Sequence, residues 1–152
     1  MRFPGVLLIP FLLVACGGES EGVRAEGEMI LEIDGTRSGF VLENNTRIDS
    51  GGPVVGSCIL RSDPEPTAYR LTSTQLLDGD ALRSIEVGFA EGDAFIEVDT
   101  GAEPFRAVGP CTIEEPYRDL SGRVGAVEVD CQMISGERSG HLFGELHFSG
   151  CR

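Results

Sequence analysis

Apolar and polar residues alternate along most of this chain from about residue 28 onward, and short turn sequences interrupt the alternation. Ile85, Val87 and Phe89 share one side of such a run, and so do Val127 and Val129 of a later one. A period of two predicts strands with one buried face and one face in water. The predicted strands are residues 28–33, 37–43, 54–61, 68–73, 82–89, 94–99, 111–115, 124–133 and 141–151.

The turn sequences between these runs are rich in Gly, Asp, Asn and Pro, the residues that favour tight turns. Examples are DG at 34–35, NN at 44–45, EGD at 91–93 and SGERSG at 135–140. The chain has no internal repeat and no sign of a second domain. It therefore predicts an all-β fold, a single antiparallel β-sandwich or flattened barrel of about seven to nine strands.

The first part of the chain has a different character. Residues 6–15 read VLLIPFLLVA and are apolar throughout. This length is typical of a signal-peptide core and falls short of the ~20 apolar residues of a membrane-spanning helix. A buried core helix is the alternative, but Pro10 and the lack of a polar face argue against it. Residues 1–15 are therefore predicted to be a signal peptide.

The end of this run, Leu13-Val14-Ala15-Cys16, resembles the bacterial lipobox. The resemblance implies that a diacylglycerol is attached to the Cys16 thiol and that cleavage makes Cys16 the N-terminus. It also implies a location in the cell envelope, at the outer membrane in an organism with two membranes, because glycine rather than aspartate follows the cysteine. Several acyl chains on one residue give a durable anchor. Residues 16–28, rich in Gly and Glu, are predicted to be a flexible linker, and residues 29–152 the β-rich domain.

The charge of the chain restricts its partners. Loss of residues 1–15 removes Arg2, so 11 of the 12 basic residues remain against 25 acidic residues, a net charge of −14. No lysine occurs. This acidity argues against nucleic acid as a partner, and against the domain lying on anionic lipid. It favours a basic protein as partner, while the membrane is expected to be contacted through the lipid anchor.

Four cysteines follow Cys16, at positions 58, 111, 131 and 151. An even number after a secretion signal predicts two disulfides. Zinc binding is the alternative, but the gaps of 53, 20 and 20 residues include no C-x2-C or C-x4-C spacing.

Candidate chemistry is sparse. Glu145 and His147 lie two residues apart and share one face of a predicted strand, so they are candidates for a metal or proton site; a solvated strand edge is the alternative. His141 lies six residues before His147, too far along a strand to share a metal with it. Asp78-Gly79-Asp80 is expected to be a turn rather than a calcium loop. No catalytic residue, metal or cofactor is predicted.

Three stretches resemble the nineteen-kilodalton lipoprotein antigens of mycobacteria: GSCILR at 56–61, LLDGDALRSIEVGF at 76–89 and GELHFSGCR at 144–152. The resemblance implies a β-rich domain without catalytic activity, carried on a lipid anchor. It also implies a disulfide between an early strand and the C-terminus. This chain departs from that family by having Cys111 and Cys131 as well.

The disulfide pairing is predicted from strand register. An antiparallel pairing centred near Ser121 places Cys111 opposite Cys131, because each lies ten residues away. A Cys131–Cys151 pair fits less well, because the turn at 135–140 sets Cys131 opposite residues that precede Cys151. Cys58 and Cys151 then remain, and the family resemblance pairs the same two ends.

Three functions follow, in order of preference. The first is a non-enzymatic, lipid-anchored protein of the cell envelope with a binding or surface role. The second is an acidic inhibitor or capture module for a basic protein, in the manner of lysozyme inhibitors. The third is an enzyme that uses scattered carboxylates.

Overall fold

In residues 22–62 and 64–152, which the computed structural model describes, nine antiparallel strands form a nearly closed barrel. The strands are β1 (Arg24–Ile33), β2 (Thr36–Arg47), β3 (Val54–Ile59), β4 (Thr67–Ser73), β5 (Leu82–Ala90), β6 (Asp93–Thr100), β7 (Pro104–Asp119), β8 (Val124–Ser135) and β9 (Arg138–Ser149). Neighbours follow the order β2-β1-β9-β8-β7-β6-β5-β4-β3. The predicted all-β fold is confirmed.

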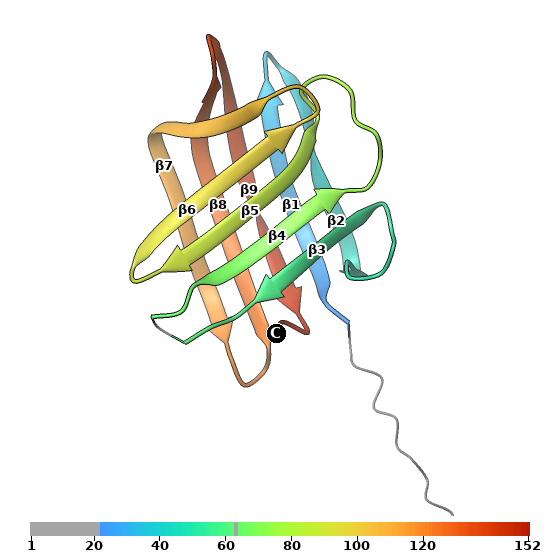
Figure 1. Cartoon of the computed structure of the whole chain (residues 1–152), viewed down its shortest axis with the longest axis vertical. Helices are drawn as coiled ribbons and strands as arrows, with labels where there is room; N and C mark the ends of the chain where they lie inside the picture. The colour runs from blue at the N-terminus through green and yellow to red at the C-terminus, as the bar shows by residue number, and fades with distance from the viewer. Residues whose placement is uncertain (1–21, 63) are drawn as a thin grey trace, which may run out of the picture.

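The barrel is flattened into two layers, which Figure 1 shows crossing each other. The larger layer holds β2, β1, β9, β8 and β7, and the smaller layer holds β6, β5, β4 and β3. The strand β7 links them, because it pairs with β8 along most of its length but with β6 only through Phe105 and Pro104. The alternation of the sequence directs apolar side chains between the layers, where the largest fully buried ones are Tyr69, Phe105, Met29, Leu31, Ile48, Leu71, Met133, Leu142, Leu146, Val87, Val127 and Val129.

The first strand begins earlier than the sequence predicted. Residues 24–28, assigned to the linker, belong to β1, and Ala25 within them is fully buried. The sequence signal is weak here because the inward positions hold the small residues Ala25 and Gly27, and the register with β2 shifts through extra residues at 43–45 of that strand. Gly27 has a φ of +114°, and a Cβ there would lie 2.2 Å from the carbonyl oxygen of Glu145, so only glycine fits. The predicted signal peptide, Cys16 and residues 17–21 lie outside the described residues.

The strand β7 is also longer than predicted, beginning at Pro104 rather than at residue 111. The register between β7 and β8 shifts between Ala107 and Cys111, and Gly109 in this interval has a φ of +64°. A bulge of this kind interrupts the period of two, so the sequence pattern does not show the strand continuing through it.

The two disulfides are Cys58–Cys151 and Cys111–Cys131, the pairs expected from the sequence. Cys111 lies directly opposite Cys131 in the register of β7 and β8. Cys58–Cys151 instead joins β3 to the segment that follows β9. Beside it, the Arg152 N–H donates to the Cys58 carbonyl (3.0 Å) and the Leu60 N–H donates to the Arg152 carbonyl (2.8 Å). These contacts close the barrel at one end.

The opposite end of the barrel has a seam between the edge strands β2 and β3. At this end the Ser38 hydroxyl of β2 accepts from the Leu82 N–H of β5 at 2.8 Å, which links the two layers. A groove of about 200 Å³ lies along the seam and is lined by Phe40, Pro53 and Leu77 among others. Across the part of the chain that is described, no helix has the length and apolar character needed to cross a bilayer.

Candidate binding face on the larger layer

The outward-pointing residues of the larger layer form straight rows across its strands, because antiparallel partners lie directly opposite one another. The central row crosses four strands: Glu28 of β1 faces Glu145 of β9, Glu145 faces Glu128 of β8, and Glu128 faces Glu114 of β7. All four side chains are exposed. We call these four residues the glutamate row.

The glutamate row concentrates negative charge that is not neutralised locally. Opposed residues on a sheet have Cβ atoms about 4.5–5.5 Å apart, and like charges at that spacing are destabilising. Within residues 22–62 and 64–152, no arginine or histidine forms an ion pair with Glu28, Glu114 or Glu128. Glu145 contacts the imidazole of His147 at 3.1 Å. Repulsion between these carboxylates therefore lowers the stability of the fold. The same charge attracts cations from the surrounding solution to this face.

Aromatic side chains lie on both sides of the glutamate row. Phe143, two residues from Glu145 on β9, packs against the His141 ring at 4.9 Å between centroids and under the Arg37 guanidinium at 5.7 Å. On the other side, Tyr117 is 53% exposed and borders a hollow of about 360 Å³. Glu26, Asn45, His147 and Ser149 also line this hollow. The face thus combines carboxylates with aromatic surface.

The two histidines take separate partners on this face. The candidates Glu145 and His147 lie together, as their spacing in the sequence predicted. His141 instead contacts Asp130 of the neighbouring strand at 2.7 Å, a pairing that the sequence did not reveal because it depends on register. No group of three or more His, Cys, Asp or Glu side chains in the described ranges is placed to hold a metal ion.

A second group of polar residues lies between the layers. The Tyr69 hydroxyl donates to the Glu115 carboxylate at 2.5 Å, and the Arg118 guanidinium lies 3.5 Å from Glu115 and donates to Thr67 at 3.2 Å. Burial, followed by the hydrogen bond to Glu115, raises the pKa of Tyr69 well above its ordinary value. Tyr69 therefore stays protonated and acts as a donor that links β4 to β7.

The turn at Asp78-Gly79-Asp80 is held by an ion pair rather than open to a cation. The Arg138 guanidinium donates to Asp80 at 2.5 Å and lies 3.6 Å from Asp34. The hydrogen bond from Arg138 lowers the pKa of Asp80. The Asp80 carboxylate is therefore paired with Arg138, which supports a structural role for the turn at residues 78–80.

Comparison with known proteins gives no relative: the chain matches no protein-family model, no curated protein and no solved structure.

Proposed function

We propose that this is a non-enzymatic, lipid-anchored protein of the cell envelope that captures a basic protein on the outer face of its larger layer. The glutamate row is the observation that carries the proposal. The lipobox-like sequence ending at Cys16 supplies the anchor, at the outer membrane in an organism with two membranes. No cofactor is needed for this function.

The size of the face suits a protein partner. Five strands spaced by about 4.8 Å and a strand β9 of 12 residues give a surface of roughly 20 by 40 Å. This is about 800 Å², the area that each partner contributes to an interface of standard size. A small metabolite would cover only a fraction of it.

The charge of the face suits a basic partner. Complementary potentials accelerate encounter and select against acidic proteins. The exposed ring of Tyr117 beside the row adds the kind of aromatic contact that arginine side chains favour. This supports the narrower form of the proposal, an inhibitor or capture module that acts on a basic envelope protein in the manner of lysozyme inhibitors.

A matched pair of variants tests the binding face, with lysozyme as the basic probe. Glu128→Gln/Glu145→Gln removes two opposed carboxylates from the glutamate row, and Glu86→Gln/Glu97→Gln removes two opposed carboxylates from the outer face of the smaller layer. Both change the net charge equally. We expect the first variant to slow association several-fold more than the second, most strongly at low ionic strength. If the two variants slow association equally, the interaction depends only on net charge, and the proposed binding face is refuted.

The anchor is tested separately. Cys16→Ser removes the thiol that would carry the lipid, so the variant should leave the detergent phase in which the wild type partitions. If the variant and the wild type partition alike, Cys16 is not the anchor.

A further inference from the structure

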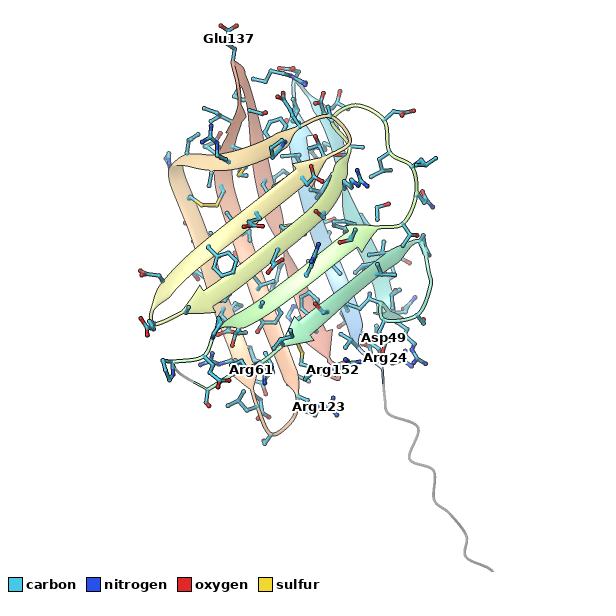
Figure 2. The ribbon with its side chains drawn as sticks, in the orientation of Figure 1. Arg24, Asp49, Arg61, Arg123, Glu137 and Arg152 are labelled. Atoms are coloured by element: carbon cyan, nitrogen blue, oxygen red, sulfur yellow. A yellow bond between two sulfur atoms is a disulfide. The ribbon has the colours of Figure 1, made fainter. Side chains whose placement is uncertain are left out.

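One end of the barrel gathers arginine residues. Figure 2 shows Arg24, Arg61, Arg123 and Arg152 at the same end of the long axis, with Glu137 at the opposite end. The pairing of the strands agrees with this view. Arg24 lies opposite Ser149, Ser149 lies opposite Val124, which follows Arg123, and the Leu60 N–H bonds to Arg152. We call this part of the surface the arginine end.

Three of these arginines have no carboxylate partner among the residues that the structure describes. Arg24 donates to the Asn45 carbonyl at 3.2 Å, Arg123 donates to the Cys151 carbonyl at 2.5 Å, and the side chain of Arg152 forms no ion pair. Asp119 lies near Arg123, because it is opposite Val124 in the register of β7 and β8.

The other arginines at this end are paired with acidic side chains. Arg61 lies 3.8 Å from Glu65, and Arg47 lies 2.7 Å from Asp49. These two pairs therefore add no net charge to the arginine end, in a chain that from Cys16 carries a net charge of −14.

The arginine end is also where the chain enters the barrel. The first strand begins at Arg24. Five residues separate Cys16 from Gly22 in the sequence, and even a fully extended chain over these six steps spans only about 20 Å. A lipid on Cys16, as in the proposed function on which this inference rests, keeps this end close to the bilayer.

We propose that the arginine end rests on anionic phospholipid headgroups, so that the barrel stands upright and the glutamate row is held clear of the membrane. In that orientation Glu28, four residues along β1 from Arg24, is raised by about 14 Å. This distance exceeds the Debye length of about 8 Å in physiological salt, so the row is screened from the lipid.

The alternative orientation lays the larger layer on the bilayer. It brings the glutamate row within a Debye length of the anionic surface. Each charge so placed changes partitioning about five-fold, and the four glutamates together disfavour this orientation by several hundred-fold. The orientation therefore follows mainly from repulsion of the glutamate row, with the arginine end as the part of the surface that tolerates contact with anionic lipid.

The experiment attaches the lipid chemically, so its result does not depend on lipidation in cells. In the chain from Cys16, the other four cysteines form disulfides, and a maleimide lipid therefore reacts only with Cys16. The chain has no lysine, so one introduced lysine in an N-acetylated chain gives a unique labelling site. Dyes are placed by Leu120→Lys at the arginine end, Gln132→Lys on the outer face of β8, and Glu137→Lys at the far end. Nitroxide headgroups in the vesicle quench dyes near the membrane.

In vesicles with 30% phosphatidylglycerol, the dye at position 120 should be quenched at least three-fold more than the dyes at 132 and 137. The difference should shrink in pure phosphatidylcholine, and Arg24→Gln/Arg123→Gln should reduce it without releasing the protein. Equal quenching at 120 and 132 in anionic vesicles would overturn the proposal, as would a pattern unaffected by lipid charge or by the arginine variant. A failure of lipidation in cells would contradict only the proposed function, because this anchor is synthetic.

Discussion

Removal of the Cys58–Cys151 disulfide should lower the stability of the domain more than removal of Cys111–Cys131. The two bridges close sequence separations of 93 and 20 residues. The shorter loop lies inside the longer one, which leaves the longer bridge an effective loop of about 74 residues. The chain-entropy relation then gives about 4.5 kcal/mol for Cys58–Cys151 and about 3.3 kcal/mol for Cys111–Cys131.

The structure adds to the larger figure. Cys58 and Cys151 are each 1% exposed, and the two backbone hydrogen bonds of Arg152 beside them depend on the same closure. Cys111, in contrast, is exposed and lies between strands that are already paired. The free energy of unfolding of a small domain is only about 5–15 kcal/mol in total. A chain that lacks both bridges should therefore be close to unfolded.

Urea titrations at pH 7 of Cys58→Ala/Cys151→Ala and Cys111→Ala/Cys131→Ala, followed by near-ultraviolet circular dichroism, measure both losses. Alanine avoids the burial of an unpaired hydroxyl. Equal losses of stability in the two variants would contradict the expected order, as would a loss of less than about 2 kcal/mol in the first variant.

Three further changes test other contacts. Glu128→Gln should raise the free energy of unfolding by roughly 0.2–1 kcal/mol at low salt, and in urea titrations the gain should vanish in 1 M NaCl. Gly125→Ala should cost about 1–3 kcal/mol, because its Cβ would lie 2.2 Å from the Tyr69 hydroxyl, and Tyr69→Phe in the same chain should recover part of the loss. Arg138 lowers the pKa of Asp80, so this pair stabilises the fold above the ordinary aspartate pKa and the contribution is lost as the pH falls through the lowered value. In urea titrations, Asp80→Asn should therefore destabilise the domain at pH 7, and its difference from the wild type should shrink as the pH falls through the lowered pKa.

The fold was predictable from the sequence because the pattern that indicates each strand lies within that strand's own residues. The alternation of Ile85 and Val87 with polar neighbours depends only on one strand having a wet and a dry side. The prediction failed at two places. At the start of β1 the inward positions are the small residues Ala25 and Gly27, which give little apolar signal, and around Gly109 in β7 a bulge interrupts the period without ending the strand.

The candidate face could be predicted only in part. The contact between Glu145 and His147 follows from a spacing of two residues on one strand. The alignment of Glu28, Glu114 and Glu128 with Glu145 depends on three separate strand registers, and the sequence fixes such registers only where a turn or a disulfide is recognised. The Cys111–Cys131 register was such a case, since its centre near Ser121 also sets Glu114 opposite Glu128.

The order of the strands has a consequence for how the protein folds. From β3 to β9, each strand pairs with the next one in the chain, but the hairpin of β1 and β2 joins the sheet only by the pairing of β1 with β9. The first hairpin of the chain must therefore wait for the last strand before its apolar face, including Met29 and Leu31, is covered. Such long-range closure slows folding and prolongs the exposure of aggregation-prone apolar surface. A circular permutant that places β1 and β2 after β9 would turn the barrel into an uninterrupted meander and should fold faster.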